Sequence, residues 1–271
     1  MKPELQRRVQ RYGWDKASDY YEDSWAEQLK PAQNLLLEMA ELKEGESVVD
    51  IACGTGLVSF KAADKVGESG FVLGTDISDR MIEASIELSK IKNIKNISFE
   101  RMDAEDLKVD DHVYDVALSA LGLMYYPDPV KACTEMKRVI KQGGRVVGAV
   151  WGDRKNCGWA EIFPIVDSRV ETDVCPLFFQ LGTEDNLKLT FEMAGLKNVK
   201  LEQISTTLYY KNTEAACSAV FAGGPVALAY AKFDDKTKAE SHAEYIESIE
   251  DFWNEDHYEI PGEFVVASGI N

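Results

Sequence analysis

Residues 48–56 constrain the fold more than any other part of the chain. An apolar, β-branched run ends at Asp50 and Ile51, a small and glycine-containing turn follows, and residues 57–63 then place apolar side chains at helical spacing. This pattern predicts a strand, a tight turn and a helix. Gly54 and Gly56 can adopt positive φ and lack a Cβ, so backbone N–H groups at the helix start can approach a ligand closely. The first βα turn of a nucleotide-binding sheet has this form.

The acidic residues near this turn indicate which nucleotide it could hold. Residues 71–76 predict a second strand that ends at Asp76, about 20 residues beyond Gly56, where a carboxylate can accept both hydroxyls of a ribose. Asp50 places another carboxylate in the turn itself, where a pyrophosphate would be repelled. Ser59 stands at the third glycine position of the dinucleotide pattern. A cationic ligand without phosphate, such as S-adenosylmethionine, therefore fits better than NAD.

At this point the chain resembles the class I S-adenosylmethionine-dependent methyltransferases, and among them the ubiquinone and menaquinone biosynthesis C-methyltransferases and related small-molecule enzymes. The resemblance covers roughly residues 45–151 and departs from the family at Ala52, where glycine is more common. The matching stretches are residues 49–56, 74–78 with Met81, 102–107, 114–119, 126–129 and 143–147.

The resemblance implies an α/β fold, with a Rossmann-like sheet of seven mostly parallel strands, an antiparallel last strand at the edge, helices on both faces and helical lid insertions. We expect one methyltransferase domain over residues 1–271. Its expected parts are an N-terminal helical cap (1–44), a cofactor-binding core (45–151), a substrate lid (152–180 and 212–258) and the C-terminal strands (181–211 and 259–271).

Hydrophobic periodicity and turn residues predict the remaining elements. Helices are expected at 28–42, 79–91, from 129 to a stop at Gly143 and Gly144, and at 183–194, with a mostly helical stretch at 212–258. Strands are expected at 97–101, 114–119, 145–151, 199–210 and 263–269.

Several residues are candidates for binding S-adenosylmethionine and its product S-adenosylhomocysteine. By resemblance, Asp103 accepts the adenine amino hydrogens, the Ala104 N–H donates to the ring, Met81 flanks the adenine, and carbonyls near Ser119 receive the ammonium. Met81 could instead be core, and Asp103 could instead cap a helix. The full set is Tyr21, Trp25, Asp50, Ala52, Cys53, Gly54, Gly56, Asp76, Ile77, Met81, Asp103, Ala104 and Ser119.

Aromatic residues suggest where the methyl acceptor binds. Tyr20, Tyr125 and Trp151 are candidates for its pocket, which favours a small and at least partly apolar acceptor. The N-terminal aromatics could equally pack a helix onto the sheet, or close over the cofactor, where an aromatic face would attract a sulfonium.

Methyl transfer from a sulfonium requires alignment and exclusion of water more than a dedicated base. The catalytic residues therefore stay unknown, with His242 and His257 as candidates for a general base and His112 expected at the surface. Asp128 and Asp153 could serve as metal ligands, but a helix start explains Asp128. We predict no metal.

Composition limits the possible partners. The formal net charge of −17 disfavours nucleic acid, and no apolar run is long enough to span a bilayer. The five scattered cysteines indicate reduced thiols, and we expect a cytoplasmic protein of undetermined oligomeric state. Two other classes stay open: a non-catalytic S-adenosylmethionine-binding subunit and a NAD-dependent oxidoreductase.

Overall fold

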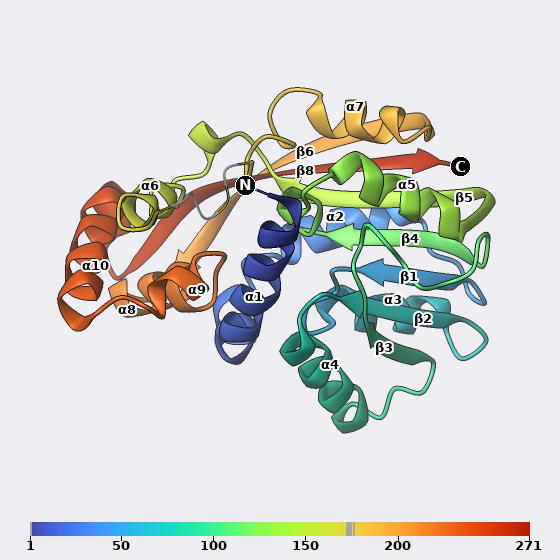
Figure 1. Ribbon diagram of the computed structural model, residues 1–271, viewed down its shortest axis with the longest axis horizontal. Helices are drawn as coiled ribbons and strands as arrows, with labels where there is room; N and C mark the ends of the chain where they lie inside the picture. The colour runs from blue at the N-terminus through green and yellow to red at the C-terminus, as the bar shows by residue number, and fades with distance from the viewer. Residues whose placement is uncertain (1, 172–174, 176) are drawn as a thin grey trace.

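A computed structural model describes residues 2–171, 175 and 177–271. In this part of the chain one sheet holds eight strands, in the order β3-β2-β1-β4-β5-β8-β6 with the short β7 beside β8 (Figure 1). The strands are β1 (Ser47–Ile51), β2 (Phe71–Asp76), β3 (Ile97–Arg101), β4 (Tyr114–Ala120), β5 (Ile140–Trp151), β6 (Lys197–Tyr210), β7 (Trp253–Asn254) and β8 (His257–Ile270).

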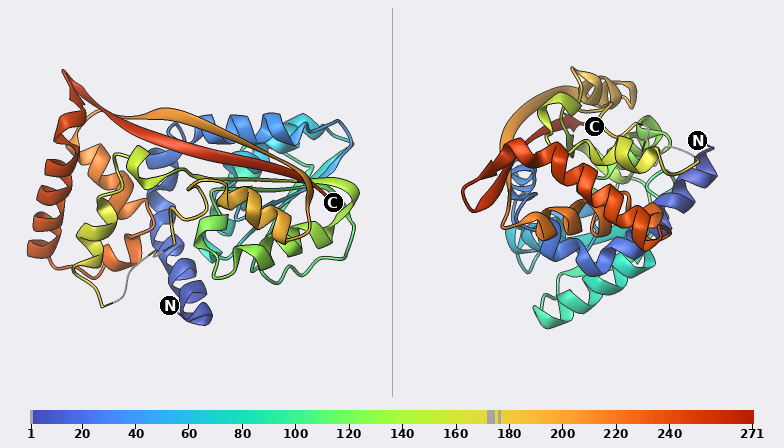
Figure 2. Two further views of the ribbon diagram at one scale, coloured as in Figure 1. Left: turned by 90° about the horizontal axis from the view of Figure 1, so that it is seen from above. Right: turned by 90° about the vertical axis from the view of Figure 1, so that its left-hand side faces the viewer.

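Helices cover both faces of this sheet (Figure 2). Helices α2 and α3 contact each other on one face, and α5 and α7 contact each other on the other. The α-helices are α1 (Pro3–Trp25), α2 (Lys30–Ala40), α3 (Leu57–Val66), α4 (Asp79–Ile91), α5 (Pro129–Val139), α6 (Ile162–Asp167), α7 (Asn186–Met193), α8 (Thr213–Cys217), α9 (Ala227–Tyr230) and α10 (Asp235–Ile249). Short 3₁₀ or π turns are η1 (Leu123–Tyr125), η2 (Arg154–Asn156), η3 (Ser218–Ala222) and η4 (Glu250–Phe252).

The order of the strands determines where a ligand can bind. Strands β1 to β5 are mutually parallel, and the chain direction across the sheet reverses at β1, which lies between β2 and β4. In parallel α/β sheets ligands bind beyond the carboxyl ends of the strands at such a reversal. The turn after β1 lies at this point.

The last strand corrects one sequence prediction. Strand β8 is antiparallel, as expected, but it lies between β5 and β6, and β6 forms the edge. Its side chains Val265, Val266 and Ala267 are almost completely buried. Their apolar character therefore reflects an interior strand, because β8 pairs with β5 on one side and with β6 on the other, and its side chains are buried on both faces of the sheet.

The end of α5 and the start of β5 also differ from the prediction. Helix α5 ends at Val139 instead of at the glycine pair, because Ile140 already pairs with Tyr114 in the sheet. Gly143 and Gly144 lie within β5, beside a shift of register, and the φ of Gly143 is +77°.

The helical stretch expected to reach residue 258 ends earlier. Trp253 pairs with Tyr258 in a hairpin, and Glu255 in its turn has a φ of +55°. Residues 172–174 and 176, inside the predicted lid segment 152–180, lie outside the described residues. The division into cap, core and lid stays a prediction.

Helix α1 lies between the sheet and a group of helices formed by α6, α8, η3, α9 and α10 (Figure 1). It contacts α9 and η3 on one side and α4 on the other. Strands β6 and β8 extend beyond the rest of the sheet into this group, with pairing that continues to Tyr210 and Tyr258. Within the described residues, no helix is long and apolar enough to cross a membrane.

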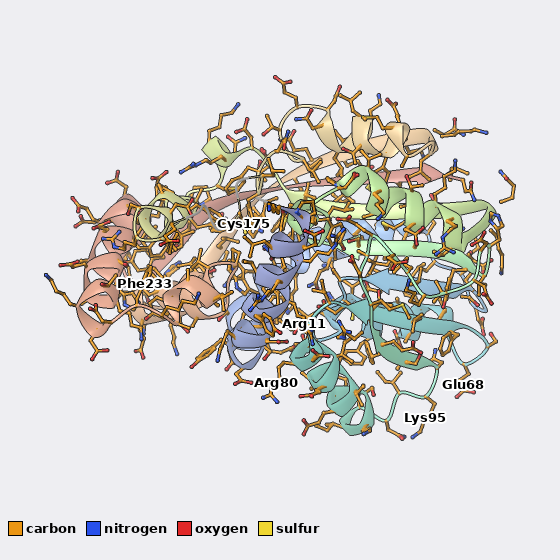
Figure 3. All side chains as sticks on the ribbon, in the orientation of Figure 1. Arg11, Glu68, Arg80, Lys95, Cys175 and Phe233 are labelled. Atoms are coloured by element: carbon orange, nitrogen blue, oxygen red, sulfur yellow. The ribbon has the colours of Figure 1, made fainter. Side chains whose placement is uncertain are left out.

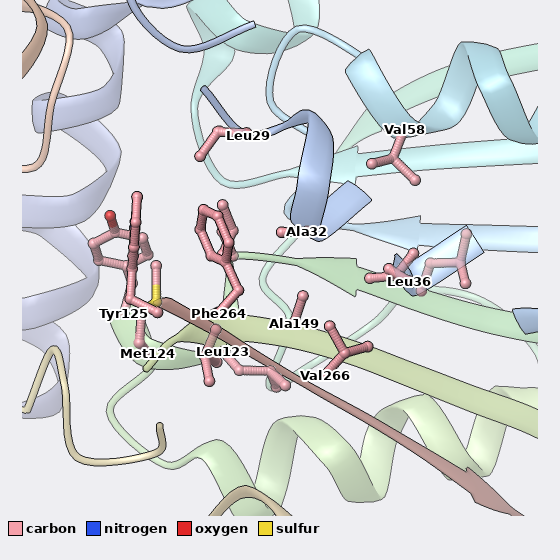
Figure 4. Close-up of a cluster of buried hydrophobic side chains, with 14 of the residues drawn as sticks. Leu29, Ala32, Leu36, Val58, Leu123, Met124, Tyr125, Ala149, Phe264 and Val266 are labelled. Carbon is pink, nitrogen blue, oxygen red and sulfur yellow. The ribbon is translucent and has the colours of Figure 1, made fainter. Parts of the chain in front are cut away.

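The hydrophobic core runs from the sheet up to the carboxyl ends of its strands. Leu36 of α2 and Phe264 and Val266 of β8 are fully buried, and the same cluster continues to Met124 and Tyr125 after β4 (Figure 4). The loop after β4 is therefore held in place by core packing.

Candidate active site

A cavity opens at the carboxyl ends of β1, β2 and β4. Helix α1 forms its opposite wall. Residues of the predicted site that line it are Tyr21, Trp25, Ala52, Gly54, Asp76, Ile77, Met81, Asp103, Ala104, Tyr125 and Trp151. Segments far apart in sequence thus meet where the strand order places a ligand.

The turn after β1 has the backbone geometry that its glycines predict. The φ angles are +57° at Ala52, +56° at Gly54 and +95° at Gly56. Ala52 and Gly54 line the cavity, whereas Cys53 and Gly56 do not. Cys53 packs with a separate apolar cluster that includes Phe99, and a Cβ on Gly56 would lie 2.9 Å from the Phe60 ring. Gly56 is therefore required for packing.

Asp50 lies beneath this turn and is fully buried. Its Oδ2 accepts a hydrogen bond from Ser59 Oγ at 2.5 Å, and its Oδ1 has no hydrogen-bond partner among the described residues. Burial raises the pKa of Asp50 to about 7. Asp50 does not itself line the cavity, but a cation bound above the turn would stabilise its charged form.

Asp76 connects the first two turns. Its Oδ2 accepts from the Gly54 N–H and its Oδ1 from the Ser78 N–H, both at 2.9 Å. Ser78 Oγ in turn accepts from the Met81 N–H and caps α4. The carboxylate is only 7% exposed, and burial raises the pKa of Asp76 to about 6. Its remaining lone pairs can accept hydroxyl hydrogens from a ligand.

Asp103 and Ala104 lie beyond β3 in a tight turn, with no helix beginning there. Asp103 Oδ1 accepts from the Glu105 N–H at 2.9 Å, and Arg7 Nε lies 2.8 Å from Oδ2. The helix-capping alternative for Asp103 is therefore wrong, because the following residues turn back instead of winding into a helix.

Ser119 is fully buried and does not line the cavity. Its Oγ lies 3.4 Å from the Tyr126 hydroxyl. The next residues, Ala120, Leu121 and Gly122, line the cavity instead. The expectation concerned backbone carbonyls near Ser119, and that role stays a prediction.

Three tryptophans group at the β5 end of the cavity, and β1 and β4 separate β5 from β2, which ends at Asp76. Ring centroids are 4.8 Å apart for Trp151 and Trp159, 5.9 Å for Trp25 and Trp159, and 6.1 Å for Trp25 and Trp151. Trp25 Nε1 donates to the Gly223 carbonyl at 3.0 Å, which links the group to the end of η3. The buried Trp159 Nε1 has no hydrogen-bond partner among the described residues.

Three sequence candidates lie elsewhere. Tyr20 is 49% exposed and lines a second hollow together with His242. There His242 Nε2 lies 3.0 Å from the Tyr230 hydroxyl, and burial lowers the pKa of His242. His257 lies between Asp256 and Glu259 on the surface hairpin, and these carboxylates raise its pKa. None of the three lines the main cavity. Tyr20 lies on a different face of α1 from Tyr21, and neither α10 nor the β7–β8 hairpin contributes a described residue to the cavity.

Asp128 and Asp153 have structural partners. Asp128 accepts from the Lys131 N–H and caps α5, and Asp153 accepts from the Lys155 N–H and caps η2. Within residues 2–171, 175 and 177–271, no group of three or more His, Cys, Asp or Glu side chains is placed to hold a metal ion.

Sequence reasoning missed several residues of α1. Arg7, Gln10 and Trp14 line the cavity beside Tyr21. Successive members of the series Arg7, Gln10, Trp14 and Tyr21 are three, four and seven residues apart, which places them on one face of the helix. This helical spacing could have identified them, but sequence reasoning considered only the aromatic residues. Trp159 and Phe178 also line the cavity. They lie in the segment predicted as part of a substrate lid (152–180), but they were not candidates for the site because no local pattern relates them to the cofactor turns.

Comparisons with known proteins agree with this architecture. Residues 42–156 match a family model described as a methyltransferase domain. The demethylmenaquinone methyltransferase of Staphylococcus carnosus is 31% identical over 209 residues, which are 70% of this chain and 86% of that protein. Aklanonic acid methyltransferase DauC of Streptomyces sp. (strain C5) is 33% identical over 133 residues, which are 49% of this chain and 60% of that protein.

A solved structure supports the fold. Phosphoethanolamine N-methyltransferase 2 of Haemonchus contortus, in complex with S-adenosyl-L-methionine, superimposes with a TM-score of 0.62 at 15% identity, over 95% of this chain and 57% of that chain. Together with the sequence relatives, the matched family model and the sheet order, this identifies the chain as a class I S-adenosylmethionine-dependent methyltransferase, in the branch of small-molecule enzymes that includes the quinone methyltransferases.

Proposed function

We propose that the enzyme methylates an uncharged, oxygen-bearing aromatic acceptor that binds against the three tryptophans, with the cofactor between α1 and the turns after β1, β2 and β3. The observation that carries this proposal is the separation of charge in the cavity. Its charged residues, Asp76, Asp103 and Arg7, come from α1 and from the ends of β2 and β3, whereas Trp25, Trp151 and Trp159 form an uncharged end.

The residues at the charged end fit S-adenosylmethionine, which supplies a methyl group on a positively charged sulfur when bound. Asp76 accepts the ribose hydroxyls, and Asp103 with the Ala104 N–H recognises adenine. Gly54 leaves space for the amino acid part above the turn, and the buried charge of Asp50 favours its ammonium. The unpartnered Oδ1 of Asp50 supports a cationic ligand nearby.

The aromatic end fits a flat, apolar acceptor. Stacked or edge-on aromatic contacts favour an aromatic ring, and the unpartnered Trp159 N–H favours an oxygen that can accept it. A phosphorylated acceptor is disfavoured, because Arg7 is the only lysine, arginine or histidine among the described cavity residues and it already contacts two carboxylates.

The side chains present support alignment and dehydration more than proton abstraction. The hydroxyl of Tyr126 is buried, and desolvation raises its pKa, so it stays neutral and can donate a hydrogen bond but cannot act as a base near neutral pH. The acceptor must therefore be a nucleophile that loses its proton readily, as hydroxylated rings do. The cytoplasmic location and the absence of a nucleic-acid partner stay predictions.

Turnover with a reduced 1,4-naphthoquinol that carries a short apolar side chain tests the proposal. We expect methylated product by mass spectrometry, with S-adenosylhomocysteine formed in equal amount, and no product with phosphoethanolamine. Trp151→Ala should raise the naphthoquinol KM and leave the Kd for S-adenosylhomocysteine unchanged. Binding of S-adenosylhomocysteine without turnover of any hydroxylated aromatic compound would contradict the acceptor assignment and favour a non-catalytic binding protein.

A further inference from the structure

We propose that Arg7 is a positioning residue that fixes the carboxylate of Asp103 for adenine recognition. This inference rests on the proposed adenine role of Asp103. Arg7 lies on α1, 96 positions before Asp103 in the chain, and both residues line the cofactor end of the same cavity.

Two groups hold the Asp103 carboxylate from its two sides. The Glu105 N–H donates to Oδ1 at 2.9 Å. On the other side Arg7 Nε lies 2.8 Å from Oδ2, an ion-pair contact in which the N–H is not aligned for a hydrogen bond. Oδ2 thus keeps its lone pairs free for a donor from a ligand, while the positive charge holds it in place.

Arg7 is itself held by a second carboxylate. Its Nη2 donates to Oε2 of Glu105, whose side chain is 3% exposed, and Oε1 of Glu105 accepts from the Asp128 N–H at 3.0 Å. This chain of contacts links α1 to the turn after β3 and to the start of α5. A guanidinium fits such a place because its planar donors can serve two carboxylates at once.

Arg7 is not needed to keep α1 in place, because other polar contacts along the helix do so. Gln6 donates to the Tyr125 carbonyl, Arg11 pairs with Asp79, and Asp15 accepts from Ser78 Oγ. Figure 3 shows Arg11 on the side of α1 that faces α4. Removing Arg7 should therefore free Asp103 without releasing the helix.

The neighbouring Arg8 offers a matched control. It lies on the same helix, is exposed, and has no ion pair or hydrogen bond among the described residues. Arg7→Gln and Arg8→Gln change the net charge equally, so a difference between them reports position and not overall charge. Arg7→Lys keeps the charge but cannot serve two carboxylates in one plane.

The test compares binding of S-adenosylhomocysteine with S-inosylhomocysteine, which lacks the adenine amino group, by titration calorimetry. We expect Arg7→Gln to raise the Kd for the adenosyl ligand about tenfold and that for the inosyl ligand by less than about twofold, so that discrimination falls. Arg8→Gln should leave both values unchanged, and Arg7→Lys should restore part of the discrimination.

Arg7→Gln leaves the buried Glu105 without its cation and could impair folding. The double variant Arg7→Gln/Glu105→Gln removes that unpaired charge and should show the same loss of discrimination. Equal weakening of both ligands would show a structural role only and overturn the proposal, as would unchanged discrimination in both variants. If Asp103→Ala abolishes discrimination while Arg7→Gln preserves it, only the role of Arg7 fails. Unchanged discrimination in Asp103→Ala would overturn the adenine assignment as well.

Discussion

The raised pKa of Asp76 predicts that cofactor affinity depends on pH. Burial raises this pKa from 3.8 to about 6, and ribose hydroxyls would donate to the ionised carboxylate. The protonated form loses lone pairs for such bonds. Binding should therefore select the ionised form and weaken as the pH falls below about 6.

The magnitude follows from the fraction that is ionised. With a pKa of about 6, nearly all Asp76 side chains are ionised at pH 8 and about one in eleven at pH 5. Because the apparent Kd is the intrinsic Kd divided by the competent fraction, the Kd for S-adenosylhomocysteine should rise about tenfold between these pH values. Binding at pH 5 should also release close to one proton.

The same shift affects stability in the opposite sense. A carboxyl group whose folded pKa is raised stabilises the fold fully below its unfolded pKa, near 3.8, and this contribution is lost as the pH rises through about 6. The cost of ionising Asp76 in the unliganded protein is about 3 kcal/mol at pH 8, as an upper limit. A ligand that donates to the carboxylate offsets part of this cost, so its stabilising effect on the melting temperature should be larger at pH 8 than at pH 5.

Titration calorimetry at pH 5, 6, 7 and 8, in buffers of different ionisation enthalpy, measures both the Kd and the proton release. Asp76→Asn is the control and should bind weakly, with a smaller pH dependence than the wild type because only Asp50 of the two aspartates then titrates in this range. Asp50→Asn separates any contribution from Asp50, whose pKa is about 7. A wild-type Kd that is constant from pH 5 to pH 8 would refute the reasoning.

Three further predictions concern single residues. Ala52→Gly should raise the free energy of unfolding by about 0.5–1 kcal/mol in urea, because alanine is strained at a φ of +57°; a loss of stability would contradict this. Trp25→Phe removes the bond to the Gly223 carbonyl and should lower the free energy of unfolding by about 1 kcal/mol. Trp25→Phe should also raise the acceptor KM and leave the Kd for S-adenosylhomocysteine unchanged. A larger change in this Kd than in the KM would place Trp25 at the cofactor end of the cavity. His242→Gln and His257→Gln should each keep kcat within about twofold of wild type, because neither residue lines the cavity and loss of a general base costs far more. A hundredfold loss of kcat in either variant would reinstate that histidine as a catalytic candidate.

Local signals predict the elements that local contacts determine. The limits of α4 and β3 agree with the sequence prediction at both ends, and Ser78 caps α4 as expected. The glycine pair in β5 misled the prediction, since Gly143 and Gly144 resemble a helix stop. What ends α5 is the pairing of Ile140 with Tyr114, a contact between distant segments.

The candidate site divides along the same line. Residues at the strand ends and in the βα turns, such as Asp76 and Gly54, line the cavity because their place follows from the strand to which they belong or which they follow. Arg7 reaches the cavity only through the packing of α1, and Trp159 only through the packing of the segment between η2 and α6. No nearby motif specifies either arrangement. His242 and His257 were candidates because histidine can act as a general base, and no sequence pattern related either of them to the cavity. Neither lines it.

The tryptophan group gives the enzyme an optical property. Of its five tryptophans, Trp14, Trp25, Trp151 and Trp159 line the cavity, whereas Trp253 is 45% exposed on the β7 hairpin. Intrinsic fluorescence should therefore report cavity occupancy almost directly, with Trp253→Phe removing the solvent-exposed background. Quenching on addition of a candidate acceptor would then let a library of compounds be screened without a label and before the product of the reaction is known.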